Sequence, residues 1–209
     1  MSNKPYSESC DQNKRPILSV LQKWFTKPDA LVFEIGSGTG QHACYFSEQL
    51  PHLKWQPSEQ SIYIPHVLAW TEEAIADSSR IQNILPVIEL DVAQQHWPEL
   101  SVDYVFSANT MHIMSWPEVE SMVKGIRYIL KPGGIFCVYG PFNYQNQYTS
   151  DSNAQFDQWL KSRDPQSGIR DFEAICHLGY IQAEGNTLSL IHDHEMPANN
   201  RLLVFQSAE

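Results

Sequence analysis

Residues 31–46 read LVFEIGSGTGQHACYF, and this stretch decides the fold class of the 209-residue chain. Its first five residues form a short apolar run that is typical of a buried strand. Glycines at 36, 38 and 40 follow at once, and glycine permits the tight backbone turn by which such a strand leads into a helix. Residues 41–50 then carry apolar side chains at helical spacing. This order of strand, glycine turn and helix indicates the first unit of a doubly wound α/β sheet.

The rest of the chain continues the alternation of short apolar runs and helical patterns. We predict further strands at 53–57, 86–90, 102–107 and 134–140, and helices at 17–25, 61–77, 116–130, 154–161 and 170–178. Two last β-rich stretches, 181–192 and 201–206, are expected to pair as an antiparallel hairpin. The pattern therefore predicts an α/β, Rossmann-like, seven-stranded mixed sheet with helices on both faces, made of five parallel strands plus the C-terminal antiparallel hairpin.

We expect a single domain over residues 1–209, because this length fits one α/β core. Within it, residues 1–30 would form an N-terminal helical cap, residues 31–140 a cofactor-binding core, and residues 141–209 an acceptor-side loop, helices and the hairpin. The formal net charge of -10 disfavours nucleic acid as a partner, because phosphate binding needs clustered cations. Four scattered cysteines, a polar start and the lack of a run of about 18 apolar residues predict a cytoplasmic protein that neither enters nor spans a membrane.

The glycine spacing distinguishes two kinds of cofactor. Dinucleotide-binding turns show G-x-G-x-x-G, whereas residues 36–41 read GSGTGQ and place Gln41 where the last glycine would fall. S-adenosylmethionine (SAM) carries an amino acid and a ribose instead of a pyrophosphate, so its site needs backbone donors and carboxylates more than a phosphate cradle. The turn therefore favours SAM over NAD.

Acidic residues follow the next two predicted strands. Glu59 lies 23 residues beyond Gly36, where a carboxylate would accept hydrogen bonds from both ribose hydroxyls. Asp91 in IELDV would accept from the adenine amino group, while the Val92 amide meets a ring nitrogen. A lone acid of this kind is as often a loop or helix-capping carboxylate. Together with the glycine turn, the two acids indicate a cofactor site.

With EIGSGTG, Glu59, Asp91 and the LKPGG that precedes the fifth strand, residues 31–140 resemble the class I SAM-dependent methyltransferases. NKRPIL, SGTGQHA, LKWQPSE, SANTMHI and MPANNRLLVF extend a closer likeness to the uncharacterised methyltransferase-like family that includes methyltransferase-like protein twenty-six. The resemblance implies SAM as cofactor, S-adenosylhomocysteine (SAH) as product and no particular acceptor. Two departures are Glu at 59, where Asp is commoner, and Pro57, which cannot donate to a sheet. The expected cofactor contacts are Glu34, Gly36, Ser37, Gly38, Gly40, His42, Glu59, Asp91, Val92 and Asn109.

Residues 107–112, SANTMH, end the fourth predicted strand beside the expected methyl group. His112 is the candidate general base and a candidate substrate contact, because imidazole titrates near neutral pH. A packed loop histidine is the alternative interpretation. Methyl transfer needs little beyond an in-line approach of the nucleophile, so a base is not a requirement. Asn109 is expected to position SAM or the substrate.

Residues 139–144, YGPFNY, end the fifth predicted strand. Tyr139, Phe142, Asn143 and Tyr144 are the remaining candidate substrate contacts; alternatively, the two aromatic residues at 142 and 144 only pack a surface loop. Residues 192–195, HDHE, suggest a metal site, but neighbouring residues of a strand face opposite ways, so no metal is expected.

These patterns leave two classes of function open. The first is a SAM-dependent methyltransferase that modifies an unidentified small molecule. The second is a non-catalytic SAM- or SAH-binding regulatory or interaction protein, which would keep the cofactor site without an open acceptor pocket. An NAD-dependent oxidoreductase is disfavoured by the glycine spacing. No motif in the sequence specifies the acceptor, its reacting atom or the oligomeric state.

Overall fold

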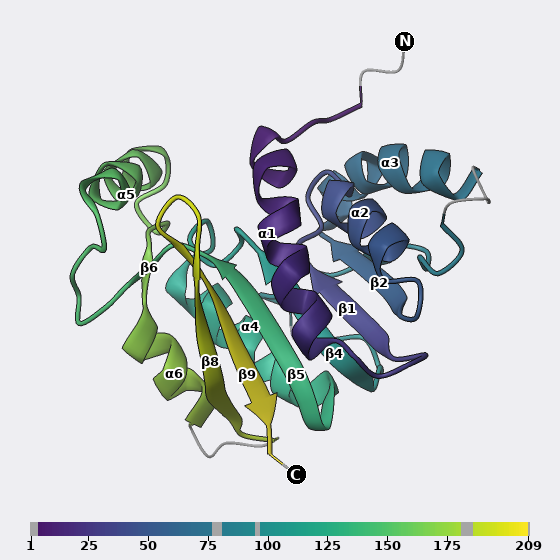
Figure 1. Cartoon of the computed structure of the whole chain (residues 1–209). Helices are drawn as coiled ribbons and strands as arrows, with labels where there is room; N and C mark the ends of the chain where they lie inside the picture. The colour runs from purple at the N-terminus through teal and green to yellow at the C-terminus, as the bar shows by residue number, and fades with distance from the viewer. Residues whose placement is uncertain (1–3, 77–80, 95–96, 181–185, 209) are drawn as a thin grey trace. The chain divides into compact units, whose positions relative to one another are not determined.

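The computed structural model describes residues 4–76, 81–94, 97–180 and 186–208. The chain divides into two compact units, which we call unit 1 (residues 1–91 and 102–107) and unit 2 (residues 92–101 and 108–209). Seven strands form a sheet in the order β3-β2-β1-β4-β5-β9-β8 (Figure 1). Parallel pairs occur on the β3 side of this order and antiparallel pairs on the β8 side. The predicted seven-stranded mixed sheet is confirmed.

Unit 1 is built around β1 (Leu31–Ile35), which pairs in parallel with β2 (Lys54–Glu59) on one side and with β4 (Val102–Ala108) on the other. β3 (Ile88–Glu89) adds to β2, also in parallel. The helical elements of the unit are α1 (Glu8–Trp24), α2 (Gln41–Gln49), the 3-10 turn η1 (Ser61–Tyr63) and α3 (Ile64–Ala76). The strand order reverses between β1 and β4, and this reversal is where open α/β sheets bind ligands.

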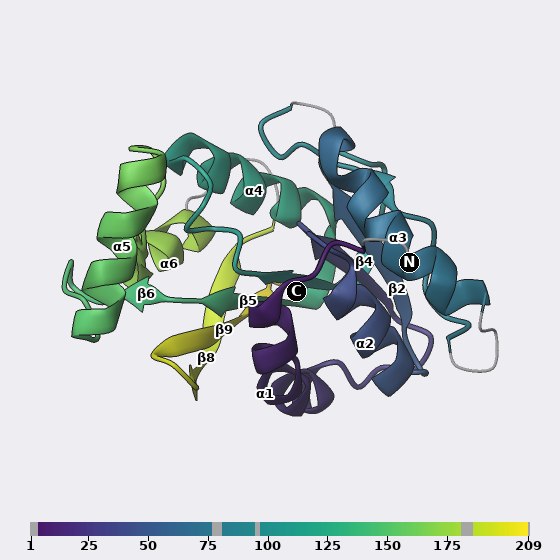
Figure 2. The ribbon, with the colours of Figure 1, turned by 90° about the horizontal axis from the view of Figure 1, so that it is seen from above.

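Unit 2 contains β5 (Leu130–Gly140), β9 (Asn200–Ser207) and β8 (Leu188–Met196), which pair in that order as antiparallel strands. Its helices are α4 (Trp116–Ile129), α5 (Asp151–Arg163) and α6 (Phe172–Tyr180). Two short strands, β6 (Phe142–Asn143) and β7 (Arg170–Asp171), form a separate parallel pair. β6 lies beside α5 in both views of the ribbon (Figures 1 and 2).

Three aromatic side chains fix α2 on the strands of unit 1. The ring of Phe46 from α2 lies 5.5 Å from that of Trp55 in β2 and 5.3 Å from that of Phe106 in β4, measured between centroids. All three side chains are fully buried, and rings of this size contribute much of the energy of a core. Because α2 begins directly after the glycine turn, this cluster also fixes where the turn lies.

Most predicted elements are confirmed with shifted ends, and the largest shift is at the start of α1. The helix begins at Glu8, nine residues before the predicted start at residue 17. Ser7 caps it by accepting a hydrogen bond from the Cys10 amide. The first turns are polar, and buried Asn13 lies among them, so apolar spacing alone could not reveal this part of the helix.

Strand β2 continues through Pro57 to Glu59, two residues beyond the predicted end. The Trp55 amide donates to the Asn83 carbonyl on the side of β2 away from β1, and the nitrogen at 57 faces the same side because strands alternate. β3 pairs only with Ser58 and Glu59, so the missing N–H of Pro57 costs no bond to β1. At the other end of the chain, β8 begins at Leu188; the predicted strand residues 181–185 lie outside the described residues.

Candidate functional site

The glycine turn of unit 1 leaves β1 with three left-handed residues. The φ angles are +72° at Gly36, +59° at Gly38 and +87° at Gly40, a region that residues with a Cβ rarely adopt. A Cβ at Gly40 would lie 3.0 Å from the Val67 carbonyl oxygen, so Gly40 lets the turn pack against α3. A Cβ at Gly38 would meet no atom within 4 Å. The turn is therefore closely packed at Gly40 and has free space beside Gly38.

The carboxylate of Glu59 holds this turn from the end of β2. Its Oε2 accepts a hydrogen bond from the Gly38 amide at 2.7 Å, and its Oε1 accepts one from the Gln60 amide at 2.8 Å. Only 8% of the residue is exposed. Each carboxylate oxygen has a second lone pair, so Glu59 retains capacity to accept from a ligand hydroxyl.

Asp91 follows β3 in the same unit. The Leu90 amide donates to the Glu59 carbonyl oxygen at 2.9 Å, so Asp91 lies one residue beyond a direct backbone link to Glu59. The structure thus brings the glycine turn and both predicted acids together in unit 1. Val92 is buried and belongs to unit 2.

Glu34, the last predicted acid of unit 1, lies inside the core behind the turn. It is 2% exposed, and its Oε2 accepts a hydrogen bond from the Trp55 indole nitrogen at 2.9 Å. Burial raises the pKa of the Glu34 carboxyl to about 7, against the opposing effect of the Trp55 hydrogen bond. The charge of Glu34 therefore changes near neutral pH, and this buried carboxyl lies two residues before the first glycine of the turn.

Ser37 lies within the glycine turn, and its hydroxyl is buried. Its Oγ meets no acceptor with good hydrogen-bond geometry among the described residues, and a weak hydrogen-bonding interaction with the Glu34 carboxyl lowers the pKa of that group. A buried hydroxyl without a partner costs free energy, which a ligand group would recover.

His42 packs beneath α1 instead of facing open space. Its Nε2 lies 2.7 Å from Asn13 Oδ1, its Nδ1 lies 3.9 Å from Cys10 Sγ, and its ring stacks on Phe46. Burial lowers the pKa of His42 to about 4, so the ring is neutral at pH 7. Its predicted contact with the cofactor stays a prediction.

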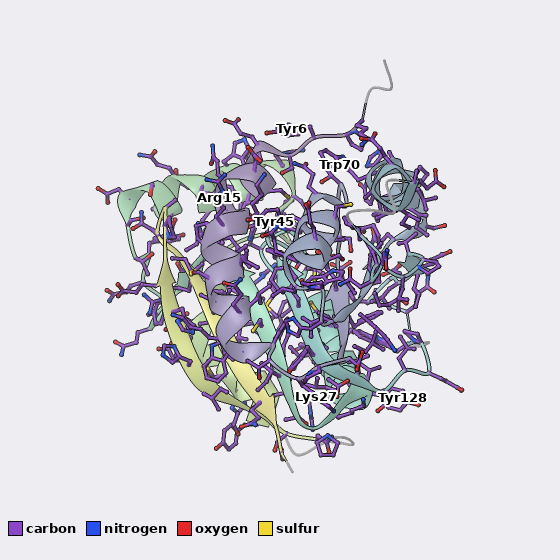
Figure 3. The ribbon with its side chains drawn as sticks, turned by 45° about the vertical axis from the view of Figure 1, so that its right-hand side comes forward. Tyr6, Arg15, Lys27, Tyr45, Trp70 and Tyr128 are labelled. Atoms are coloured by element: carbon purple, nitrogen blue, oxygen red, sulfur yellow. The ribbon has the colours of Figure 1, made fainter. Side chains whose placement is uncertain are left out.

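Residues 5–7, which precede α1, are bound to α2 and α3 by polar groups that were not predicted from the sequence. Gln41 Oε1 accepts from the Ser7 amide at 2.6 Å, and its Nε2 donates to the Ser7 carbonyl. The Trp70 indole donates to the Pro5 carbonyl, and Figure 3 shows Trp70 of α3 near Tyr6 of this segment. These contacts join residues 34 and 65 positions apart, so no local pattern announces them.

In unit 2, the loop after β4 carries the two predicted polar residues Asn109 and His112. Asn109 has φ +59°, and its amide donates to the Tyr139 carbonyl at 2.9 Å, which ties the loop to β5. His112 is 7% exposed, and its ring meets that of Phe156 edge to face at 5.3 Å. Burial, and secondarily the charge of Arg170, lower the pKa of His112 to about 4. The ring is thus a neutral, buried imidazole.

The other predicted substrate residues differ in how far the protein itself uses them. Phe142 and Tyr139 are buried, and the Tyr144 hydroxyl donates to Asp193 Oδ2 at 2.7 Å while its ring stacks on Phe172. Asn143 Oδ1 is buried and has no hydrogen-bond partner in the described part of the chain. Among these four, Asn143 is the residue with an unused polar atom.

Residues 192–195 do not gather into a metal site. The rings of His192 and His194 stack on one face of β8 with centroids 3.8 Å apart, while Asp193 Oδ1 accepts from Arg201 Nε at 2.7 Å. Across the described ranges, no group of three or more His, Cys, Asp or Glu side chains is placed to hold a metal ion.

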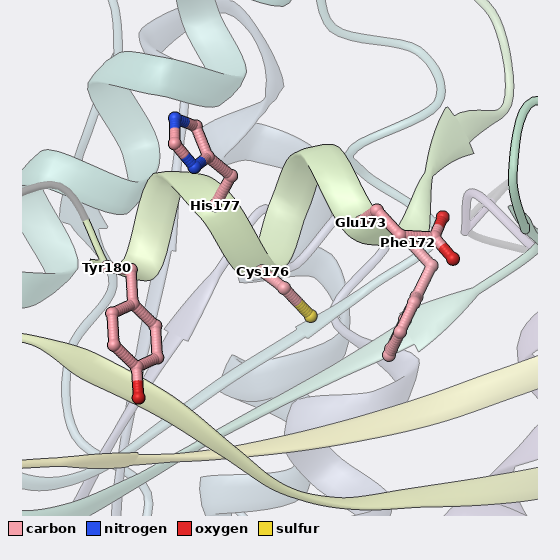
Figure 4. Close-up of a pocket in the computed structure, with 5 residues that line it drawn as sticks. All are labelled: Phe172, Glu173, Cys176, His177 and Tyr180. Carbon is pink, nitrogen blue, oxygen red and sulfur yellow. The ribbon is translucent and has the colours of Figure 1, made fainter.

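The hollow shown in Figure 4 lies on α6, and none of the predicted site residues lines it, although Phe172 at one end stacks on Tyr144. Its volume is about 570 Å³, and it is lined by Phe172, Glu173, Cys176, His177 and Tyr180. Phe172, Cys176 and Tyr180 point to the same side of the helix. No residue outside α6 lines the hollow, so we read it as an exposed helix face.

Comparisons with known proteins identify both a family and a fold. A family model described as "Protein of unknown function (DUF938)" matches residues 4–207. An O-methyltransferase family protein from Burkholderia thailandensis has a similar structure, with a TM-score of 0.78, 13% identity, and coverage of 97% of this chain and 58% of its own. Human N-acetylserotonin methyltransferase, solved in complex with SAM, is also similar, with a TM-score of 0.71 and 16% identity. The match covers 97% of this chain and 53% of the human structure. An O-methyltransferase family 2 protein from Planctomyces limnophilus, solved in complex with apigenin, has a TM-score of 0.71 and 11% identity. Here the match covers 92% of this chain and 61% of that structure.

This chain spans a little more than half of the length of each of those structures. At such low identity, the likeness shows that the folds agree. Among the described helices, none combines the length and the apolar character that crossing a bilayer requires.

Proposed function

Because the chain belongs to the family described as Protein of unknown function (DUF938), whose description names no activity, we propose from the site itself that this protein is a SAM-dependent methyltransferase of the class I type. The acceptor is a small molecule, and SAH is the second product. One observation carries the proposal: Glu59 spans from the end of β2 to the amide of the open glycine, Gly38, and still has lone pairs to offer.

The residues present fit SAM. Space beside Gly38 allows a ligand to approach the backbone, and the unpartnered Ser37 hydroxyl provides a donor or acceptor to it. We assign Glu59 to accept from the ribose hydroxyls, and Asp91 to accept from the adenine amino group. Gly36, Gly40 and Glu34 shape and support the turn, and His42, Val92 and Asn109 complete the proposed set. The structural neighbours agree, since one was solved with SAM bound.

SAM supplies a methyl group on a positively charged sulfonium, which makes the methyl electrophilic. In the proposed reaction, the bond from sulfur to methyl breaks, the acceptor atom bonds to the methyl, and the acceptor proton leaves. His112 is our candidate to take that proton, because a neutral imidazole has a free lone pair at pH 7. Its low pKa makes it a weak base, so we assign most of the rate enhancement to positioning and to exclusion of water.

The acceptor is proposed to contact His112, Tyr139, Phe142, Asn143 and Tyr144. Asn143 Oδ1 has an unused acceptor capacity, which suits an O–H or N–H donor on the substrate. A small-molecule acceptor agrees with the apigenin bound in one neighbour. We also propose that residues 1–209 form a single domain. The closer likeness to the uncharacterised methyltransferase-like family is proposed to reflect a shared activity. We further propose that the protein works in the cytoplasm.

Calorimetry with SAH and, separately, with NADH tests the cofactor. We expect SAH to bind and NADH to give no heat of binding; tight binding of NADH without SAH would overturn the proposal. Incubation with methyl-labelled SAM and a metabolite extract tests the reaction. We expect labelled product that disappears in Glu59→Ala and Gly38→Val variants. Binding of SAH without any transfer would instead favour a non-catalytic SAM sensor.

A further inference from the structure

One short strand of unit 2, β7, contacts both segments that carry the proposed acceptor residues. Its Arg170 pairs through the backbone with Phe142 of β6. The Arg170 guanidinium reaches the loop after β4, where Nε donates to the Met111 carbonyl at 2.9 Å and Nη2 donates to the Met114 carbonyl. A single residue thus links β6 to the loop that carries His112.

The residues before Arg170 bind the same loop. The Gly168 amide donates to the His112 carbonyl at 2.9 Å, and Ser167 Oγ donates to the Ile113 carbonyl at 3.1 Å. Every carbonyl from residue 111 to residue 114 therefore accepts a hydrogen bond from residues 167–170, which we call the clamp segment. A loop held at four consecutive carbonyls has little freedom to reorient its side chains.

The clamp segment is itself held by Asp157 of α5, which is 1% exposed. Asp157 Oδ1 accepts from the Ile169 amide at 2.6 Å, while Oδ2 accepts from the Tyr148 hydroxyl at 2.7 Å and from Lys161 Nζ at 2.6 Å. A Cβ at Gly168 would lie 3.0 Å from Asp157 Oδ1, so the clamp segment packs closely on this helix. The hydrogen bonds continue from α5 through the clamp segment to His112.

A second link pins the chain beyond β6. The Asn146 amide donates to Asp171 Oδ2 at 2.7 Å, and the Gln145 amide donates to Glu173 Oε2 at 2.9 Å. Both donors have left-handed φ angles, +52° at Gln145 and +59° at Asn146, so the carboxylates stabilise a turn that its own residues disfavour. β7 and the start of α6 thereby fix both acceptor segments.

We propose that Arg170 is a positioning residue of the acceptor site, whose guanidinium fixes the loop at 111–114 and with it the His112 ring. The inference rests on the proposed function, because His112 has a chemical role only there. Four charged groups surround this region. Arg170 comes from β7, Asp157 and Lys161 pair with each other on α5, and Glu118 on α4 lies close enough to influence Arg170.

Arg170 has two separable effects on His112. Its hydrogen bonds hold the loop, and its positive charge adds to burial in lowering the pKa of the imidazole. Replacement by Gln removes the charge and the fork of donors. Replacement by Lys keeps the charge but has no planar fork that can bind two carbonyls at once. The two variants therefore distinguish positioning by hydrogen bonds from the action of charge alone.

NMR titration of the full chain with isotope-labelled histidine and glycine tests the proposal, with the His112 signal assigned from a His112→Gln variant and the Gly168 signal from a Gly168→Ala variant. In wild type we expect His112 to stay neutral from pH 8 down to pH 5. In Arg170→Gln we expect its midpoint to rise by roughly half a pH unit or more, and the Gly168 amide to exchange with solvent at least about fivefold faster. In Arg170→Lys we expect the faster exchange without the rise in pKa.

Arg163→Gln is the matched control, because Arg163 lies on exposed α5 surface and stacks on Trp159. It should leave both signals at their wild-type values. If Arg170→Gln folds and changes neither signal, the proposal is overturned. If that variant does not fold, unchanged Gly168 exchange in Arg170→Lys overturns it. SAH binding is measured on the same samples. If wild type does not bind SAH, the proposed function alone is refuted. If wild type binds SAH but the NMR signals of the Arg170 variants are unchanged, the positioning role of Arg170 alone is refuted.

Discussion

The proposed cofactor residues of unit 1 and the proposed acceptor residues of unit 2 are held in different ways. In unit 1, the key bond joins Gly38 to Glu59 across 21 residues, and the two come from adjacent strands. In unit 2, the loop that carries His112 is held by Arg170 across 59 residues, and Tyr144 by Asp193 across 49. The proposed cofactor residues of unit 1 follow a local pattern of strand, turn and acid, and the proposed acceptor residues of unit 2 depend on distant side chains.

This difference has a functional meaning under the proposed reaction. A cofactor is the same molecule in every related enzyme, so a fixed backbone turn and fixed strand-end carboxylates can serve for its binding. An acceptor differs from enzyme to enzyme, and loops held by side chains can change with few substitutions. The following predictions separate the two units, because each perturbs one and leaves the other as a reference.

The largest effect is expected at Glu59. Glu59→Ala removes the acceptor for the Gly38 amide and the proposed ribose contact, so SAH affinity should fall at least about a hundredfold, or about 3 kcal/mol. Calorimetry measures it. Glu89→Ala is the matched control, because Glu89 pairs in register with Glu59 on β3 and is exposed. If both variants bind SAH like wild type, unit 1 is not the cofactor site.

The next effect is expected in unit 2, at Asp157. Asp157→Ala leaves the Ile169 amide, the Tyr148 hydroxyl and Lys161 without their acceptor, and should lower the free energy of unfolding by about 2 to 3 kcal/mol. Urea unfolding measures the loss. SAH affinity of the folded variant should match wild type, and exposed Gln158→Ala should change neither quantity. If the Asp157→Ala variant keeps its stability but loses SAH binding, the assignment of cofactor binding to unit 1 and of this stabilising role to Asp157 would be wrong.

The fold class could be predicted from the sequence because its signals are local, and the cofactor residues assigned to unit 1 rest on equally local signals and stay a prediction. GSGTG marks its own turn, and Glu59 and Asp91 follow apolar runs at strand ends. The start of α1 was misplaced because its first turns are polar, and Ser7 and Asn13 have partners on α2 that the local sequence does not reveal. Strand β2 was predicted too short because Pro57 argues against a strand until its neighbours are known.

The clamp segment lay beyond sequence reasoning for the same physical reason. Arg170 carries no motif, and its three acceptors are backbone carbonyls that any residue provides. Asp157 lies in a helix between half-buried Phe156 and exposed Gln158, in a polar stretch of sequence where it looks like a surface acid. His112 became a candidate because histidine is chemically distinctive, but its burial and its low pKa involve Phe156 and Arg170, which are 44 and 58 residues away.

A comparison within the glycine turn gives a smaller effect. Gly40→Ala places a Cβ against the Val67 backbone, which cannot yield as a flexible side chain does, and should cost about 2 kcal/mol of stability. Gly38→Ala points into open space and should cost about 1 kcal/mol, from its φ angle alone. Thermal and urea unfolding measure both variants.

The same pair separates folding from binding. Folded Gly40→Ala should retain most of its affinity for SAH, whereas Gly38→Ala should lose about tenfold, because its Cβ occupies the space that we assign to the cofactor. Equal affinities in the two variants would show that the open side of Gly38 does not face SAH. The observation that carries the proposed function would then need another explanation.

The smallest effect is a pH dependence at Glu34. Its pKa is raised from the ordinary 4.5 to about 7, so the folded state holds a proton that the unfolded chain has released. Its contribution to stability is therefore complete below pH 4.5 and is lost as the pH rises through 7. Between pH 6 and 8, wild type should lose about 1 kcal/mol relative to Glu34→Gln, whose amide oxygen still accepts from Trp55.

The buried histidines give the opposite sign and serve as the internal reference. The pKa values of His42 and His112 are lowered to about 4, so their neutral forms favour folding increasingly as the pH rises from 4 to 6.5. Subtracting the urea stabilities of Glu34→Gln from those of wild type cancels both terms, because each variant keeps both rings. A difference that stays flat from pH 6 to 8 would mean that Glu34 is ionised throughout, and that the turn it supports has a permanent negative charge beneath it.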